Sequence, residues 1–207
     1  MNVELLMSDP VVVAVPVRED GDPLVVLGPG FGPAGARVRR AVAARLALAQ
    51  DGLPRGTSLR VVEGLRELSA QRAIIATYSA QVRAAHPDAD DDLVHHLTSR
   101  FVAPVAVAPH VAGSAVDLTL VDERGRELDL GTPIDATPED SRGACATAAP
   151  VGATARRHRE VLGDVLLAAG FVNYPTEWWH WSFGDRYWAA VTGAEHALHG
   201  PLEEVRS

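Results

Sequence analysis

The stretch GSAVDLTL at residues 113–120 alternates small, apolar and polar side chains, as a central β-strand does. A second apolar run, LRVV at residues 59–62, predicts another short buried strand, and Arg66 follows its end. The apolar N-terminal stretch is interpreted as a further strand, and the glycine- and proline-rich residues 21–35 mostly as surface loop. These segments predict the sheet of the fold.

Helices are predicted where apolar residues recur with helical spacing between start and stop signals, over residues 36–50, 69–85, 91–100 and 156–169. The segment 130–150 is rich in Thr, Asp, Pro, Gly and Ala, which predicts a long functional loop. Near the C-terminus, residues 179–183 are predicted to pair with 186–191 as a tight hairpin across Gly184-Asp185.

Composition restricts the class of protein. The 207 residues, 47% of them hydrophobic, predict one globular domain over 1–207, divided into an N-terminal strand and loop (1–35), a main region (36–191) and a C-terminal tail (192–207). A net charge of -8 argues against nucleic acid as a partner, and the lack of lysine excludes a lysine Schiff base and a Walker-type phosphate loop.

The compartment is predicted from the cysteine content and the N-terminus. Cys145 is the only cysteine, so an intrachain disulfide is impossible, and no signal-like or membrane-spanning segment is apparent. We expect a cytoplasmic protein with a small-molecule or peptide substrate and no membrane partner. The sequence carries no signal for an oligomeric state.

Two clusters combine histidine with carboxylate. His110 is followed seven positions later by Asp117, and Glu177 precedes His180 by three. Two histidines and one carboxylate complete the protein ligands of a catalytic zinc site, and the remaining carboxylate is then free to take a proton. Each pair alone is a weak signal. In a regular strand Glu177 and His180 point to opposite faces, so a shared site requires a turn, for which the preceding Pro-Thr pair is well placed.

Other conspicuous residues have ordinary structural explanations. The acidic run 88–92 is interpreted as a solvated helix start, since aspartates cap N-termini, and His95 and His96 as surface residues. Cys145 has no neighbouring base in the sequence and is not expected to be catalytic. The four tryptophans within residues 178–188 are interpreted mainly as core and wall, some of them next to the substrate.

Together, these segments resemble the VanX-type D-alanyl-D-alanine dipeptidases, whose signatures are SxHxxGxAxD and ExWH. The corresponding stretches here are APHVAGSAVD at residues 108–117 and EWWH at 177–180. The resemblance extends from about residue 36 to 191 and also covers the stretches LRVVEGLR, SAVDLTL, LGTPID and AAGFVNYPTEWWHWSFGDRYWAA.

By this resemblance, His110, Asp117 and His180 are expected to bind one Zn²⁺ per chain, with Glu177 as the catalytic glutamate. Arg66 matches the arginine that stabilises the transition state in the family; the alternative is a structural arginine paired with an acidic neighbour.

Asp135 in the LGTPID turn matches a family aspartate that could orient a zinc-bound imidazole or meet the substrate's ammonium group; the alternative is a turn-capping aspartate. Three departures bear on substrate choice. Ala108 replaces the serine of the first signature, and the turn that usually reads DGYRP has Leu65 and Glu67 in place of its tyrosine and proline.

We expect an α+β domain with a central antiparallel sheet flanked by helices and the zinc site on one sheet face. The resemblance implies hydrolysis of D-Ala-D-Ala by a metal-activated water in the cytoplasm, where that dipeptide is a precursor of cell-wall peptidoglycan, and a link to glycopeptide antibiotic resistance. One alternative is the same chemistry on another small or modified dipeptide. The other is a zinc-stabilised binding domain without turnover; the related fold of the hedgehog signalling domain shows that such a domain is possible.

Overall fold

The computed structural model describes residues 5–202, and the ends of the predicted N-terminal strand and C-terminal tail, 1–4 and 203–207, lie outside it. Within that range, no helix has the length and apolarity needed to cross a bilayer. Helices and strands follow in the order α1 (Pro10–Val13), β1 (Leu24–Val26), β2 (Arg37–Arg39), α2 (Arg40–Asp51), β3 (Thr57–Glu63), α3 (Leu68–Ala85), α4 (Asp91–Ser99), β4 (Ala115–Asp122), α5 (Ala153–Ala168), β5 (Val172–Asn173), β6 (His180–Ser182) and α6 (Arg186–Thr192), with short 3-10 turns at Pro29–Phe31 and Val105–Val107.

The central sheet has four strands in the order β3-β4-β6-β5, and every neighbouring pair is antiparallel. Strand β4, which contains residues 115–120 of the predicted central strand, is an inner strand and is buried over its length except at its last residue. Strands β1 and β2 form a separate antiparallel pair. The prediction of an α+β fold with a central antiparallel sheet is confirmed.

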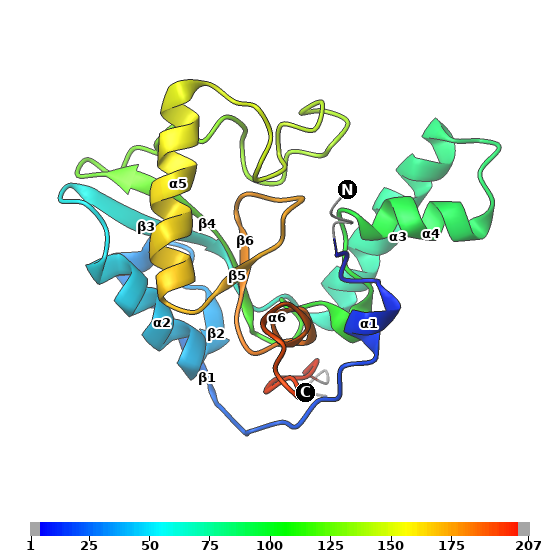
Figure 1. The fold of residues 1–207 in the computed structure, drawn as a ribbon, viewed down its shortest axis with the longest axis horizontal. Helices are drawn as coiled ribbons and strands as arrows, with labels where there is room; N and C mark the ends of the chain where they lie inside the picture. The colour runs from blue at the N-terminus through cyan, green and yellow to red at the C-terminus, as the bar shows by residue number, and fades with distance from the viewer. Residues whose placement is uncertain (1–4, 203–207) are drawn as a thin grey trace.

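The two faces of the sheet have different neighbours. Val116 and Leu118 of β4 belong to the main hydrophobic core together with Leu46 of α2 and Leu162 of α5, so these two helices cover one face (Figure 1). Because successive side chains of a strand alternate, Asp117 points to the other face. That face carries the predicted site.

The helices α3 and α4 pack against each other at the other end of the molecule (Figure 1). They have a small apolar cluster of their own, built from Tyr78, Val82, Val94 and Val102. A third cluster, which includes Val12, Val107, Tyr174 and Tyr187, joins α1 and α6 to the segment before β4. The chain between Arg66 and His110 thus forms a partly separate wall beside the sheet.

The structure differs from the expectation in three places. The apolar segment before Pro16 forms α1, with Pro10 in its first turn, rather than a strand. The segment predicted as one helix from residue 36 begins with β2, which pairs with β1, before α2 starts. The predicted hairpin was wrong, because the Asp185 carboxylate accepts hydrogen bonds from the amides of Tyr187 and Trp188 and starts α6.

Candidate active site

Three carboxylate or imidazole side chains lie in a row across neighbouring strands. Asp117 of β4 is paired in register with His180 of β6 on one side and with Glu63 of β3 on the other. The register of β3 shifts between Val61 and Glu63, so that Val62 forms a bulge. Without that extra residue Val62 would lie opposite Asp117, and the bulge therefore brings Glu63 to the site.

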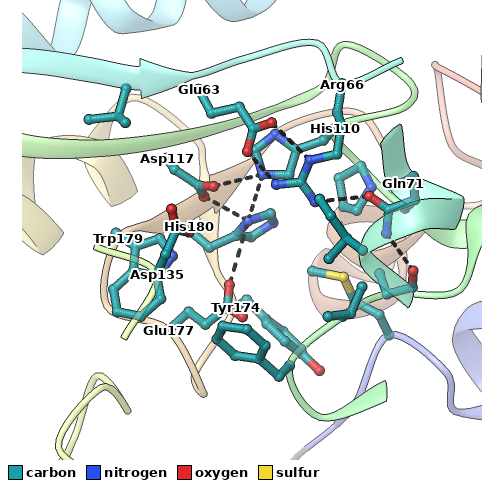
Figure 2. Close-up of a pocket in the computed structure, with 18 residues that line it drawn as sticks. Glu63, Arg66, Gln71, His110, Asp117, Asp135, Tyr174, Glu177, Trp179 and His180 are labelled. Atoms are coloured by element: carbon teal, nitrogen blue, oxygen red, sulfur yellow. Dashed lines mark hydrogen bonds and ion pairs between the residues drawn. The ribbon is translucent and has the colours of Figure 1, made fainter. Parts of the chain in front are cut away.

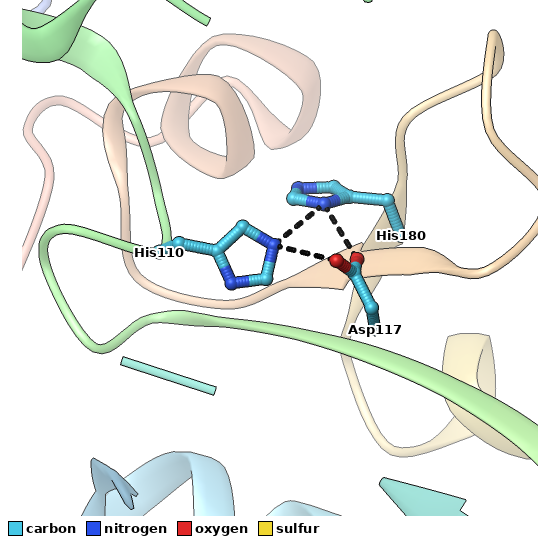
Figure 3. Close-up of side chains that lie close together, drawn as sticks. All are labelled: His110, Asp117 and His180. Carbon is cyan, nitrogen blue, oxygen red and sulfur yellow. Dashed lines mark hydrogen bonds and ion pairs between the residues drawn. The ribbon is translucent and has the colours of Figure 1, made fainter. Parts of the chain in front are cut away.

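His110 reaches the same place from the turn that precedes β4. Its Nδ1 lies 2.7 Å from the carbonyl oxygen of Gly64, a pure acceptor, so Nδ1 carries the proton and Nε2 presents its lone pair. That Nε2 lies 3.2 Å from a carboxylate oxygen of Asp117 and 3.1 Å from Nδ1 of His180 (Figure 3). The other Asp117 oxygen lies 3.0 Å from His180 Nδ1.

The donor set of His110, Asp117 and His180 fits a transition-metal ion. All three are buried, and one ligand atom from each lies within 4.8 Å of the others. Zinc ligands about 2.0–2.2 Å from the ion in a tetrahedron are separated by roughly 3.3 Å, close to the separations found here. With both imidazoles neutral and both lone pairs directed inward, a cation at the centre offsets the repulsion between these nitrogens and the carboxylate.

The charges of the cluster agree with this fit. Burial alone would raise the pKa of Asp117, but its interactions with His110 and His180 hold that pKa well below the usual range. Burial lowers the pKa of His180, which favours the neutral, ligating form. Asp117 and His180 thus favour the protonation states that a metal ion requires. Burial works against a charged His110, but the charge of Asp117 raises its pKa, so a metal ion that binds there has to displace a proton.

Glu177 lies beside this cluster because the chain turns before β6. Pro175 and Thr176 form a turn, and the strand begins only at His180, as the shared site requires. The Glu177 carboxylate is buried and lies 3.9 Å from His180 Nδ1. Burial, followed by the negative charges of Asp117 and Asp135, raises the pKa of Glu177 well above its ordinary value.

Arg66 enters the site from the turn after β3. Its Nε donates a hydrogen bond of 2.8 Å to Glu63, its Nη2 donates to the second oxygen of the same carboxylate, and its Nη1 donates to Gln71 at 2.9 Å (Figure 2). Burial works against the charged guanidinium, but these interactions with Glu63 raise its pKa. Arg66 is therefore paired with an acidic neighbour and also lines the site.

Asp135 lies in the loop between β4 and α5, with its backbone in the left-handed region at φ 62°. Its side chain faces the cavity that the other site residues line, while the residue keeps an exposed surface. The surrounding protein and the negative charges of Asp117 and Glu63 raise its pKa. Within residues 5–202, it makes no hydrogen bond to either imidazole of the cluster.

These side chains line one cavity of about 490 Å³ (Figure 2). One part of its lining is polar, and another part is an apolar wall formed by Met7, Val62, Ile74, Phe101, Val102 and Ala103. Ala108 lies in the lining where the family signature has serine. Gln71 and Glu63 also line the cavity, and no sequence pattern points to Gln71. Glu63 stands three positions before Arg66, a spacing that suggests an ion pair.

The alternative interpretations of other residues are also resolved. Asp90 caps α4 by accepting from the amide of Leu93, and Asp91 forms an exposed ion pair with Arg83, so the acidic run is a solvated helix start. His95 and His96 are exposed. Cys145 is buried in the main core with Trp178, Trp179 and Trp181, of which Trp179 also lines the cavity.

Known proteins resemble the chain in sequence. A family model described as D-ala-D-ala dipeptidase matches residues 36–197. A D-alanyl-D-alanine dipeptidase of Synechocystis is 30% identical over 138 residues, which cover 61% of this chain and 56% of that protein. One of Escherichia coli is 38% identical over 82 residues, which cover 39% of this chain and 41% of its own length. The chain thus spans about half the length, or less, of these curated relatives.

Solved structures share the fold. VanYB in complex with D-Ala-D-Ala superposes with a TM-score of 0.54 at 17% identity, covering 89% of this chain and 94% of that one. A zinc-bound mutant of the vancomycin resistance D,D-pentapeptidase VanY gives 0.53 at 17%, covering 91% and 95%. Since the family model covers most of the chain, including all six of the predicted site residues, the chain belongs to the D-ala-D-ala dipeptidase family of peptidases.

Proposed function

We propose that this protein hydrolyses the dipeptide D-Ala-D-Ala with one zinc ion per chain. The observation that carries the proposal is the buried cluster of His110, Asp117 and His180 with the Glu177 carboxylate 3.9 Å from it. The dipeptidase names of the relatives and the zinc and D-Ala-D-Ala of the two VanY structures support the same chemistry.

The ligands would be His110 through Nε2, Asp117 through a carboxylate oxygen and His180 through Nδ1. Bound there, zinc supplies a Lewis acid that polarises the scissile carbonyl and lowers the pKa of a water toward about 7. The hydrogen bond from His110 Nδ1 to Gly64 holds the imidazole in the ligating tautomer. The protein part of the site is therefore oriented before substrate arrives.

Glu177 is proposed as the general base and then the general acid. Its carboxylate takes a proton from the attacking water and passes it to the amine that leaves when the peptide bond breaks. A carboxylate with a raised pKa holds a proton more readily than an ordinary glutamate does, which suits both steps.

Arg66 is proposed to stabilise the tetrahedral transition state. Its guanidinium lines the cavity and retains N–H groups beyond those bound to Glu63 and Gln71. The negative charge that develops on the carbonyl oxygen attracts such donors more strongly than the planar amide does, and this difference accelerates the reaction.

Asp135 is proposed to receive the ammonium group of the substrate. Its carboxylate lines the same cavity and is not bound to the imidazoles of the cluster, which favours this role over orienting a ligand. An ammonium ion would be held there by charge and hydrogen bonding. Free dipeptides, which carry that group, are then preferred to blocked ones.

For the setting of the reaction, we propose the cytoplasm, with the full 1–207 segment acting as one dipeptidase domain. There the substrate is a precursor of cell-wall peptidoglycan, and its removal would contribute to glycopeptide resistance. Measuring resistance and the pool of D-Ala-D-Ala in cells with and without the protein tests this setting.

The enzymatic proposal is tested with purified, zinc-loaded protein. D-Ala-D-Ala, L-Ala-L-Ala and the mixed dipeptides are incubated separately, and release of free amine is followed, with Glu177→Ala as control. Cleavage of D-Ala-D-Ala that disappears in the variant supports the proposal. A protein that binds one equivalent of zinc but cleaves none of them would instead be a zinc-stabilised binding domain.

A second candidate is the same chemistry on a dipeptide with a larger apolar side chain. The cavity of about 490 Å³ falls in the range that holds drug-sized ligands, and one wall of it is apolar. D-Ala-D-Ala offers only two methyl groups to that wall. Each further buried CH₂ contributes about 0.8 kcal/mol, so a preference for D-Ala-D-Leu of roughly tenfold or more in kcat/KM would favour this candidate.

A further inference from the structure

We infer that Gln71 is a positioning residue for Arg66: it sets the orientation in which the guanidinium faces the reacting carbonyl. The inference rests on the proposed hydrolysis. It concerns a buried side chain in the first turns of α3, outside both sequence signatures and remote from the metal ligands along the chain.

The first step is a count of donors. A guanidinium has five N–H groups in a rigid plane. Three are used within the protein: those of Nε and Nη2 bind Glu63, and one of Nη1 binds Gln71 (Figure 2). Among residues 5–202, no other bond uses the second N–H of each terminal nitrogen, and the direction of both is decided by the bonds that hold the plane.

The pair with Glu63 alone does not hold that plane in place. Glu63 and Arg66 come from one short turn, and the Glu63 side chain keeps 33% of its surface exposed. A paired carboxylate and guanidinium on the same turn can pivot together. A bond to a different element removes this motion, and Gln71, which is 1% exposed, provides it from α3.

Gln71 is itself held in one orientation. Its Oε1 accepts from Arg66 at 2.9 Å, and its Nε2 donates to the carbonyl of Ala103 at 2.7 Å. A flipped amide would place NH₂ against the guanidinium and oxygen against a carbonyl, so both bonds fix the same rotamer. Because Ala103 belongs to the apolar wall, Gln71 links the arginine to that wall of the cavity.

The expected consequence is kinetic. Replacing Gln71 with methionine, which is similar in size but has no amide, leaves Arg66 charged and bound to Glu63 yet free to pivot. Misplacing a catalytic group by about 1 Å costs up to roughly 100-fold in rate, so we expect kcat to fall about 10- to 100-fold. KM should change less than about threefold, because the lost contact is specific to the transition state.

A double-mutant cycle tests this. Turnover of D-Ala-D-Ala by the zinc-loaded wild type, Gln71→Met, Arg66→Ala and the double variant is measured over long incubations. If Gln71 acts through Arg66, its replacement lowers kcat in the wild type but by less than about twofold in the Arg66→Ala background. A tetrahedral phosphinate analogue of the dipeptide should lose affinity for Gln71→Met in proportion to the loss of kcat/KM.

Thr98→Val is the matched control. Thr98 is buried in the same helical pair, and its hydroxyl bonds Ser79 rather than any residue of the site. This variant should lower the melting temperature as Gln71→Met does, but leave kcat unchanged. Equal losses of kcat in both Arg66 backgrounds, or a loss in Thr98→Val, would show that Gln71 has only a structural role. A wild type without turnover would overturn the proposed hydrolysis and this role together.

Discussion

At the scale of single residues, the site depends on which nitrogen of each histidine is bare. A backbone carbonyl, that of Gly64, decides this for His110. His180 Nδ1 lies 3.0 Å from the Asp117 carboxylate and would be bare with a metal ion bound between them. His180 Nε2 is buried without a hydrogen-bond partner among residues 5–202, so this ring is hydrogen-bonded only through Nδ1, the nitrogen that faces the proposed metal position. The two histidines are thus supported unequally.

Replacing Glu177 with glutamine is expected to separate chemistry from metal binding. The amide cannot take a proton from water, so turnover should fall about 100- to 10,000-fold. The three ligands are untouched, and metal analysis should still find one zinc per chain. His180→Ala should instead lose both the metal and the activity, and retention of turnover by Glu177→Gln would contradict its role as the base.

How far these residues could be predicted follows from their chemistry. The two signatures and their spacing identify His110, Asp117, Glu177 and His180 because ligands and bases must be particular residue types. Nothing comparable identifies Gln71. Glutamine is common, and its contact with the arginine depends on the packing of α3 against the wall of the cavity, which spacing does not reveal.

At the scale of elements, the turn between β3 and α3 positions more of the site than its length suggests. It holds Gly64, whose carbonyl binds His110, and Arg66 two residues later. The β3 bulge just before it sets the side on which Glu63 lies. The proposed metal ligand His110 and the proposed catalytic Arg66 are therefore supported by one short segment of backbone.

Gly64→Ala is expected to weaken metal binding. A Cβ at this position would lie 2.5 Å from the carbonyl oxygen of Arg37, so the backbone must move and take the His110 acceptor with it. Loss of such an outer contact costs about 10- to 100-fold in metal affinity. Competition with a chelator measures the zinc affinity of the variant and of the wild type. Gly28→Ala, where a Cβ meets nothing within 4 Å, should leave the affinity unchanged.

Arg159 of α5 is expected to hold the long loop that carries Asp135. It donates hydrogen bonds to the backbone carbonyls of Leu130, Ala144, Ala146 and Thr147. Arg159→Met removes these donors, at about 1–3 kcal/mol for each carbonyl left buried without a partner. Thermal unfolding should show a melting temperature lower by several degrees, whereas the exposed Arg157→Met should not change it.

The elements that could be predicted are the regular ones. The helices α3, α4 and α5 and the strand β4 are predictable because the spacing of their apolar residues is regular along their length, and Asp90 also caps α4. The segment after Ser182 was misread as a returning strand, although Asp185 followed by Arg-Tyr-Trp is also a helix start. Strand pairing excludes the hairpin, because β6 already has β4 on one edge and β5 on the other and cannot pair with a further strand.

At the scale of the whole molecule, the two ends of the described chain meet at a buried histidine. His199 Nδ1 lies 2.8 Å from the hydroxyl of Ser114, and its Nε2 faces Asp20 and Asp22 at 3.7 and 3.9 Å. Strand-like bonds between residues 16–20 and 197–198 lie beside it. This junction closes the fold beside the start of β4.

The stability of the fold should decrease as the pH drops below the pKa of an ordinary histidine side chain. Burial, then the charge of Arg39, lowers the pKa of His199 in the folded protein. In the unfolded chain the same side chain has a pKa of about 6.5, so the unfolded state binds more protons. The stabilisation is therefore complete above pH ~6.5 and decreases below it. Melting temperatures between pH 7.5 and 5 should show a weaker dependence in His199→Asn than in the wild type or in His95→Asn, whose site is exposed.

Zinc should act as a cross-link of the folded state. Its proposed ligands come from β4, β6 and the turn before β4, and are not assembled in the unfolded chain. A ligand that binds only the folded form stabilises it by about 4 kcal/mol at a thousandfold excess over Kd. Adding zinc to the stripped protein should raise the melting temperature of the wild type but not of Asp117→Ala; an equal rise in both would place the ion elsewhere.

The inner position of β4 also determines how often different parts of the site open. Buried and bonded on both edges, β4 should contain the slowest-exchanging amides of the chain, whereas the α3–α4 pair, with only its own small cluster, should open far more often. Asp117 would then stay in place while the wall that carries Gln71 and Phe101 loosens and closes again. Such openings would let substrates in and products out without dismantling the ligand set.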